Sequence, residues 1–378
     1  MNQQTILIVW MLITTMVLVG IFNTRYFDFL DSTKKLKNLE INGLRFFLSI
    51  GVAFHHFVYS FMYHSGKGWV VDGFNVNFFM GRFSVAIFFI ISGYLFYDKI
   101  SINTKWKEFF LNRFLRIAPM TFVSSAICIS IAIYLDDGSF ELSKQIWNIL
   151  YWFDAGIFNL RMNVSSVPNA TLINAGVTWT LYWEWALYFS LPLLSLLMKK
   201  EARAPVIITL IAASYYLMPT VNYKAGCYAA LFSFGFLAKE LSINTRNKFI
   251  INIAPIAIIL SIIFIGSSSL TLPIIPLCFL FFVSVNNKGS LFGILKNKGV
   301  QRLGEISYSI YILHGIAWFI MNVNYKSNEI TNINYLVVSS LSIIITITIC
   351  SLTYKFIELP CMGISKKIQK NNQLQSSM

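Results

Sequence analysis

The sequence has few charged residues, few histidines and few cysteines for its length. Only 12% of the 378 residues are charged, and only 16 of them are acidic. A water-soluble domain usually has about twice that share of charged residues, so this class of protein is excluded. The five cysteines are scattered and mostly lie in apolar segments, which argues against a disulfide framework and against a metal-binding spacing.

What the chain has instead is long apolar blocks, which recur from end to end and make 56% of the sequence hydrophobic. This pattern predicts an all-α polytopic membrane protein. The net charge of +14 comes from basic residues spread over short loops, so it does not indicate nucleic-acid binding. The first block, ILIVWMLITTMVLVGIF, has no positive region before it and no convincing cleavage site, so we interpret it as a retained span.

The apolar blocks predict eleven spans, of which the sixth to ninth are short and hardest to separate. They cover residues 5–22, 41–62, 78–97, 117–135, 177–198, 205–220, 226–238, 249–265, 270–285, 306–323 and 333–356.

The distribution of basic residues predicts the orientation of these spans. If segment 23–45 is cytoplasmic and the sides alternate, all but six of the 30 Lys and Arg residues are cytoplasmic. The positive-inside rule then places the N-terminus outside and the C-terminus in the cytoplasm. The longest outer segment, 136–176, contains an amphipathic aromatic run around Trp147 and Trp152. We expect it to form a partial helix that packs against the outer mouth of the helix bundle.

The most informative pair of residues is Arg45 and His56, eleven positions apart in one apolar segment. Charged or titratable side chains inside a span are costly, so they need a reason to be there. The separation covers roughly 16 Å and about three helical turns, which places both groups near one helix face. By angle the adjacent His55 is also plausible. The pair predicts a site that binds an anion at its entrance, near one membrane surface, and transfers a proton deeper in the span.

Four further residues are candidates for chemistry, and each has a structural alternative. Glu184, the only acid in its span, serves either as counter-ion of a buried arginine or as partner of the histidine. Arg82 opens a span at the outer side, as an interfacial anchor or as a contact for an anionic substrate. Arg113 and Arg116 share one helix face, in a membrane-surface helix or in a clamp for a phosphate-bearing cofactor.

Six motifs in order make the chain similar to the acyltransferase-3 family of integral membrane acyltransferases. The first is an arginine, ten residues and a histidine, present as LEINGLRFFLSIGVAFHH, and strict spacing selects His56 rather than His55. The other five are FFIISGYL at 88–95, RFLRIAP, WTLYWE ending at Glu184, GEISYSIYILH ending at His314, and KFIELP.

The family resemblance also predicts the domain organisation. The family core has ten spans, so residues 5–22 are expected to be an extra N-terminal transmembrane helix. The chain departs from the family pattern at Asn42, Phe46 and Ala86, where many or some members have aspartate, glycine and proline. The predicted divisions are an N-terminal helix with a basic cytoplasmic loop at 1–38, the acyltransferase core at 39–361, and a flexible basic tail at 362–378.

The resemblance implies an O-acyltransferase of the bacterial cytoplasmic (inner) membrane. Family members move an acyl group, usually acetyl, from cytoplasmic acetyl-CoA to a hydroxyl of a surface glycan or its lipid-linked precursor. The compact chain suits an O-antigen or exopolysaccharide enzyme. We expect membrane lipids around the protein, no nucleic-acid partner and no metal.

The site residues are assigned roles on the same basis. His56 is the general base, and Glu184 lies near it and stabilises the imidazolium. Arg45 joins these two in the catalytic set. The phosphates of acetyl-CoA contact Arg45, Arg113 and Arg116, and the acceptor contacts Arg82, Trp179 and His314.

Two questions stay open at the level of sequence. A transient acyl-histidine is an alternative to direct acyl transfer. A transporter or flippase for a glycolipid also uses buried His, Arg and Glu, although the sequence shows no internal repeat of the kind common in transporters. A structural or assembly protein would not need the pair formed by Arg45 and His56.

Overall fold

The computed structural model describes residues 2–31, 38–101, 103–138, 140–164, 166–167, 169–241, 247–265 and 273–364. Every regular element in these ranges is helical, which confirms the predicted all-α class. The chain forms two compact units: unit 1 comprises 1–58, 71–103 and 186–307, and unit 2 comprises 59–70, 104–185 and 308–378. Lys34, Lys35, Lys37 and the tail from 365 onward, on which the predicted loop and tail depend, lie outside the described residues.

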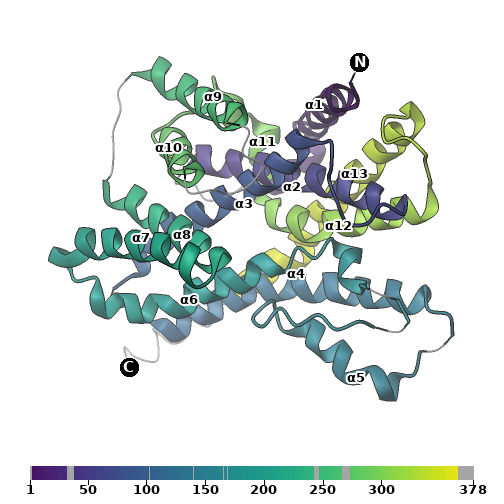
Figure 1. The fold of residues 1–378 in the computed structure, drawn as a ribbon, viewed down its shortest axis with the longest axis horizontal. Helices are drawn as coiled ribbons and strands as arrows, with labels where there is room; N and C mark the ends of the chain where they lie inside the picture. The colour runs from purple at the N-terminus through teal and green to yellow at the C-terminus, as the bar shows by residue number, and fades with distance from the viewer. Residues whose placement is uncertain are drawn as a thin grey trace. The chain divides into compact units, whose positions relative to one another are not determined.

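Unit 1 contains the N-terminal helices and the middle of the chain (Figure 1). Its helices are α1 (Gln3–Phe22), η1 (Arg25–Leu30), most of α2 (Leu39–His64), α3 (Asn75–Phe96), η2 (Tyr97–Lys99), the later part of α6 (Trp179–Leu197), η5 (Lys200–Ala202), α7 (Arg203–Thr220), α8 (Tyr223–Leu241), α9 (Lys248–Phe264), α10 (Ile274–Asn286), η6 (Ile294–Lys296) and α11 (Lys298–Glu305).

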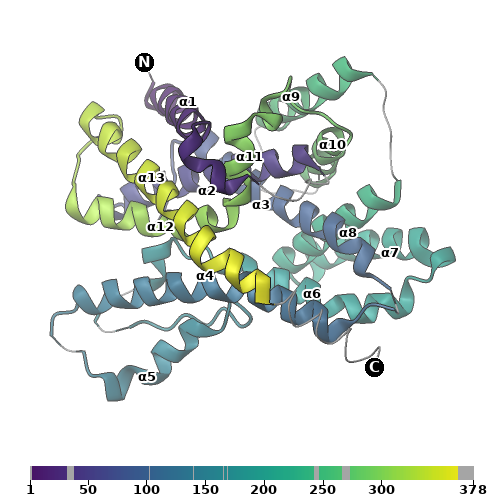
Figure 2. The ribbon, with the colours of Figure 1, turned by 180° about the vertical axis from the view of Figure 1, so that it is seen from behind.

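Unit 2 combines the segment after α3 with the C-terminal helices. Its elements are α4 (Trp106–Tyr134), α5 (Leu142–Leu150), η3 (Tyr151–Phe153), η4 (Ala170–Asn174), the start of α6, α12 (Ser307–Asn324), α13 (Ile333–Thr353) and the π-helical turn η7 (Tyr354–Glu358). Figure 2 shows α13 and η7 running toward α4, and η7 packs against that helix.

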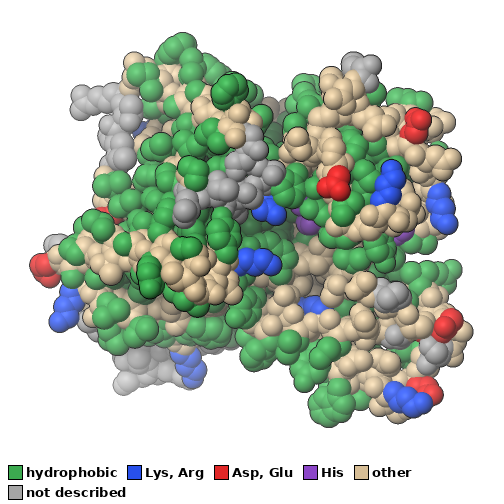
Figure 3. Space-filling model, in the orientation of Figure 1, with side chains coloured by type: hydrophobic (Ala, Val, Ile, Leu, Met, Phe, Trp, Pro, Cys, Tyr) green, Lys and Arg blue, Asp and Glu red, His purple; other side chains and the backbone are tan. Residues whose placement is uncertain are grey.

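Each of the eleven predicted spans coincides with a helix or a bent helix pair. Within the described residues, five helices are long and apolar enough to cross a membrane: α1, α2, α3, α4 and α13. A sixth span results if α11 and α12, bent by 75°, count as one, while α9 and α10 are shorter apolar helices. Large apolar side chains such as Met16, Phe264 and Ile345 are exposed on these helices, and hydrophobic side chains predominate on the face in Figure 3. The chain is a polytopic helical membrane protein.

Helices α3 and α8 cross at unusually close range because glycines replace side chains at the crossing. A Cβ at Gly93 would collide with the carbonyl of Phe232, and a Cβ at Gly235 would collide with the carbonyl of Ile90. Small residues at helix crossings are the usual way in which helices pack tightly in a membrane. This crossing anchors the helix that carries Arg82.

Arg302 is one of the basic residues that the positive-inside rule assigns to the cytoplasmic side. Its side chain is only 1% exposed. It donates to the carboxylates of Asp28 and Asp31 and to the carbonyls of Phe22 and Thr24. Arg302 on α11 therefore satisfies the carbonyl of Phe22 at the C-terminus of α1 and binds the carbonyl of Thr24 in the turn that follows.

Helix α4 joins two segments that the sequence analysis treated as separate. The predicted surface helix and the predicted span 117–135 form one helix of 29 residues, Trp106–Tyr134, with Pro119 inside it. At about 1.5 Å per residue it exceeds the roughly 30 Å thickness of a bilayer core. Its N-terminal turns, which carry Arg113, therefore extend beyond the apolar part of the span.

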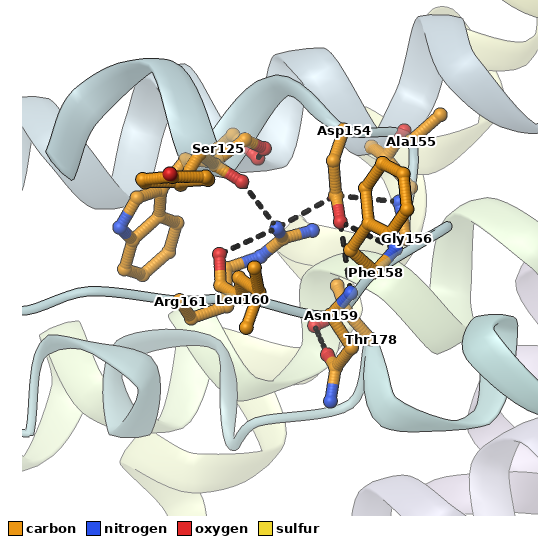
Figure 4. Close-up of polar contacts among 12 residues, drawn as sticks. Ser125, Asp154, Ala155, Gly156, Phe158, Asn159, Leu160, Arg161 and Thr178 are labelled. Atoms are coloured by element: carbon orange, nitrogen blue, oxygen red, sulfur yellow. Dashed lines mark hydrogen bonds and ion pairs between the residues drawn. The ribbon is translucent and has the colours of Figure 1, made fainter. Parts of the chain in front are cut away.

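The segment at 136–176 forms the predicted partial helix, α5, and then folds into a turn stabilised by charge. The carboxylate of Asp154 accepts hydrogen bonds from the backbone N–H groups of Gly156, Phe158 and Asn159 and from Arg161, as Figure 4 shows. The side chains of Asp154 and Arg161 are 7% and 4% exposed. Arg161, one of the six basic residues that the positive-inside rule leaves on the outer side, is a buried structural residue that keeps the segment folded.

Candidate active site

Helix α2 carries two of the predicted site residues of unit 1, Arg45 and His56, and the adjacent His55. Arg45, His55 and His56 lie in one uninterrupted helix, Leu39–His64, and all three are half-buried. The helix is packed closely on one side, because a Cβ at Gly43 would collide with the carbonyl of Leu295. Close packing of this kind fixes the helix and therefore the direction of its polar side chains.

His55 has a defined hydrogen-bond partner on the neighbouring helix α3. Its Nδ1 lies 2.9 Å from the main-chain carbonyl oxygen of Asn77. A carbonyl only accepts hydrogen bonds, so Nδ1 carries the proton and Nε2 carries the lone pair of the neutral ring. The ring fits because the neighbouring residue on α3 is Gly81. A Cβ at this position would occupy the space of the His55 ring.

The two histidines of α2 contact each other. The ring centroids of His55 and His56 are 4.9 Å apart, in an edge-to-face arrangement. A ring whose neighbour is held in place loses part of its own freedom to rotate. Sequence reasoning selected His56 alone and missed this support. Two adjacent histidines in an apolar helix were the available signal.

Arg82 lies one residue after Gly81 on α3 and is exposed. Its guanidinium stacks over the ring of Phe78 at 4.3 Å, and that ring is 6.3 Å from the ring of His55. An exposed arginine fixed over an aromatic face presents its donors in a defined direction. Arg82 therefore lies on α3, the same helix whose Asn77 carbonyl binds His55.

Unit 2 contains the predicted arginine pair, and Arg116 has a structural partner there. Its Nη1 donates to the carboxylate of Glu358 in η7, and Glu358 also accepts a hydrogen bond from the hydroxyl of Ser309. The guanidinium carbon of Arg116 lies 5.4 Å from the ring centroid of Tyr308. Sequence analysis quoted KFIELP as a motif but assigned no role to Glu358. A lone acid beside an apolar segment, similar to the signal that singled out Glu184, was available for Glu358 as well.

The remaining predicted residues, Glu184, Trp179 and His314, also belong to unit 2. Glu184 is half-buried near the start of α6 and interacts electrostatically with Tyr308. The hydroxyl oxygens of Thr180 and Tyr311 are 2.9 Å apart, which ties the start of α6 to α12.

His314 lies one turn further along α12 than Tyr311 and is completely buried. Its Nδ1 donates to the carbonyl of Ile310 at 3.1 Å. The next residue, Gly315, has no side chain, and a Cβ there would collide with the backbone of Asn174. His314 is therefore enclosed where α12 meets η4.

Comparison with known proteins identifies the family. The acyltransferase-3 family model, described as an acyltransferase domain, matches residues 38–355. This match covers most of the chain and includes every predicted site residue.

The chain belongs to the acyltransferase-3 family.

A curated relative supports the same assignment. Nodulation protein 10 of Rhizobium leguminosarum bv. viciae is 26% identical over 182 residues, which cover 41% of this chain. The chain spans about half the length of this relative, 47%. No solved structure matches the chain.

Membership in the acyltransferase-3 family confirms the resemblance drawn from the motifs. Helix α1 precedes the matched region, which begins at residue 38. Arg45, His56 and Arg82 belong to unit 1, and the other predicted site residues belong to unit 2. The proximity of Glu184 and His56 stays a prediction.

Proposed function

We propose that this acyltransferase moves an acetyl group from cytoplasmic acetyl-CoA to a hydroxyl of a cell-surface polysaccharide or of its lipid-linked precursor. The observation that supports this best is that Arg45 and His56 are half-buried side chains on one helix of a membrane protein. Such groups are costly in a span, so they indicate a functional site. We place the protein in the bacterial inner membrane with its N-terminus outside, on the charge distribution of the loops.

The chemistry requires a base, because a sugar hydroxyl is almost entirely protonated near neutral pH. In the proposed step His56 accepts the hydroxyl proton while the hydroxyl oxygen attacks the thioester carbon. The carbon–sulfur bond then breaks, and the imidazolium returns its proton to the departing CoA thiolate. Glu184 stabilises the imidazolium in this scheme. A route through an acyl-histidine uses the same residue as nucleophile.

The donor is anionic, and Arg45, Arg113 and Arg116 are the proposed contacts for its phosphates. Arg113 and Arg116 lie one turn apart on the extended N-terminal part of α4. Guanidinium groups pair well with phosphate oxygens because they present parallel donors. The pairing of Arg116 with Glu358 gives this arginine a second task, since it also stabilises the junction of α4 and η7.

The acceptor is proposed to contact Arg82, Trp179 and His314. Arg82 is exposed and held over Phe78, and Trp179 is half-buried at the first residue of α6. An arginine fits a carboxylate or phosphate on the acceptor, and an aromatic ring fits the apolar face of a sugar.

The proposal is tested by labelled acetyl transfer in membrane vesicles that contain the protein. With acetyl-CoA labelled in its acetyl group, the wild-type protein should transfer label to the glycan fraction, and His56→Ala should not. A mass shift on the surface polysaccharide identifies the acceptor. If membranes containing correctly inserted protein neither transfer label nor hydrolyse acetyl-CoA, the proposed function is wrong.

A further inference from the structure

Helix α1 is connected by hydrogen bonds to α3, the helix whose Asn77 carbonyl accepts the hydrogen bond of His55. The side-chain Nε2 of Gln4 donates to Oδ1 of Asn77 at 3.1 Å. Oε1 of the same Gln4 accepts from the backbone N–H of Val76 at 3.2 Å. Both partners lie in the first turn of α3, which has no side-chain cap of its own at Phe74. Gln4 thus caps a helix N-terminus from a different helix.

Asn77 passes this connection on to α2. Its Nδ2 donates to the carbonyl of Phe54 at 3.0 Å, and its own main-chain carbonyl accepts from Nδ1 of His55. The Asn77 side chain is completely buried. A buried amide whose donor and acceptor are both satisfied has one favourable orientation. The Asn77 side chain therefore holds Gln4 of α1 and the Phe54 carbonyl of α2 in fixed positions.

Packing of aromatic side chains reinforces the same contact. Trp10 of α1 lies against Phe54 and Phe57 of α2, with centroid distances of 5.3 Å and 4.6 Å. These residues flank the histidine pair in the sequence. The hydrogen bonds and the rings therefore hold α1 against α2 at the level of His55 and His56.

We propose that α1 belongs to the catalytic apparatus, with Gln4 and Asn77 as positioning residues that fix His55 in its Nδ1–H tautomer against His56. This inference rests on the proposed role of His56 as base. Groups that orient an active imidazole through a hydrogen bond to its other nitrogen, or through a neighbouring ring, set how well it accepts a proton. The extra helix before the family region then contributes to turnover as well as to anchoring.

The first arm of the test compares two adjacent glutamines. Gln4→Met keeps the side-chain length but removes both hydrogen bonds, and Gln3→Met is the matched control because Gln3 is exposed. We expect Gln4→Met to lower kcat about tenfold, with KM for both substrates and the membrane content of protein unchanged. Gln3→Met should match the wild type. If Gln4→Met and Gln3→Met have the same kcat and the same histidine spectrum, the proposal is overturned.

The second arm reads the tautomer directly and does not depend on activity. In protein labelled with ¹⁵N-histidine, the His55 signals are identified by their loss in His55→Gln. The wild type should show Nδ1 protonated and Nε2 unprotonated, and Gln4→Met should show a mixture of tautomers. A wild-type spectrum with Nε2 protonated contradicts the proposal. If His56→Ala retained full activity, the proposed function would fail, while this spectrum would still decide whether α1 holds His55.

A third variant disturbs the His55 ring through α3 instead of through α1. Gly81→Ala puts a methyl group where the His55 ring lies, without changing α1. Like Gln4→Met, this variant should lower kcat and change the His55 spectrum. If Gln4→Met fails to accumulate in membranes, Gly81→Ala decides whether turnover depends on the position of His55: an unchanged kcat and spectrum overturn the proposal, and a lowered kcat with a changed spectrum supports this part of it.

Discussion

Arg116 and Glu358 form an ion pair in which the glutamate is 1% exposed and the arginine 19% exposed. Glu358 is bound on its other oxygen by the hydroxyl of Ser309. The pair joins the N-terminal half of α4 to η7, which follows α13. This gives an arginine of the family motif a measurable structural role, separate from any role in binding the donor.

The first prediction concerns that pair. Glu358→Leu or Arg116→Met alone should destabilise the protein by about 3–5 kcal/mol, because each leaves a buried partner without compensation. The double variant should recover part of the loss, since it removes both charges. Thermal unfolding in detergent measures the effect. Equal instability of the double variant and the two single variants would show that the pair is not the source.

The second prediction separates donor binding from stability. Arg113→Ala and Arg45→Ala should raise KM for acetyl-CoA by roughly ten- to a hundredfold, the equivalent of about 1.5–3 kcal/mol for a charged hydrogen bond. KM for the acceptor should change little. Lysine variants should restore binding only partly, because lysine lacks the planar fork. An unchanged KM in well-folded protein would exclude these residues from the donor site.

The third prediction concerns the two histidines. His56→Ala should abolish acyl transfer while the amount of protein in the membrane stays near the wild-type level. His55→Ala should retain measurable turnover, because His55 positions its neighbour and does not itself take the proton. Initial rates at saturating donor compare the two variants. The reverse order of activities would make His55 the base.

The fourth prediction concerns Glu184. Glu184→Gln preserves the shape of the side chain and removes its charge, so the protein should fold and bind both substrates. Its kcat should fall strongly because the imidazolium loses its counter-charge. The alternative is that Glu184 only neutralises an arginine. In that case the glutamine variant lowers protein yield, and removing the arginine restores it.

The fifth prediction concerns acid pH and the loop between α1 and α2. Lys298 and Arg302 hold the pKa of Asp28 below its usual value of 3.8, and Arg302 does the same for the pKa of Asp31. A lowered folded-state pKa contributes stability that is present above pH 3.8 and is lost as the pH falls through the folded-state pKa.

Unfolding temperatures measured from about pH 5 to about pH 3 should therefore fall less steeply for Asp31→Asn than for the wild type. Asp72→Asn, at an exposed acid in the loop before α3, is the control and should follow the wild-type curve. Parallel curves for wild type and Asp31→Asn would remove these ion pairs as the cause.

The helices could be predicted from the sequence because hydropathy and length determine them almost independently of tertiary context. The bend between α11 and α12 could not be predicted. Nor could the burial of Arg302 on α11, because its partners Asp28 and Asp31 are more than 270 residues away along the chain. A basic residue near an apolar block has the same local pattern whether it faces water or is buried in an ion-pair cluster.

The candidate site shows the same division. Arg45 and His56 are recognisable because a charge and an imidazole stand out in an apolar helix. Gln4 and Asn77 do not stand out, since neutral amides are common near helix ends. Their role depends on which side chains meet between α1, α2 and α3, and this information is tertiary. Glu358 lies between these cases, since its residue type was visible but its partner was not.

The cluster around Arg302 has a consequence for how the protein is made. The acids at 28 and 31 leave the ribosome long before their arginine, which follows Asp31 by 271 residues. At about 5–20 residues per second, this delay is on the order of tens of seconds. During that interval the first helix inserts before its trailing acids can pair with Arg302, while its contacts with α2 and α3 through Gln4 and Trp10 can already form. The C-terminal end of the first helix, which the acids follow, is therefore secured by Arg302 only after α11 has been synthesised.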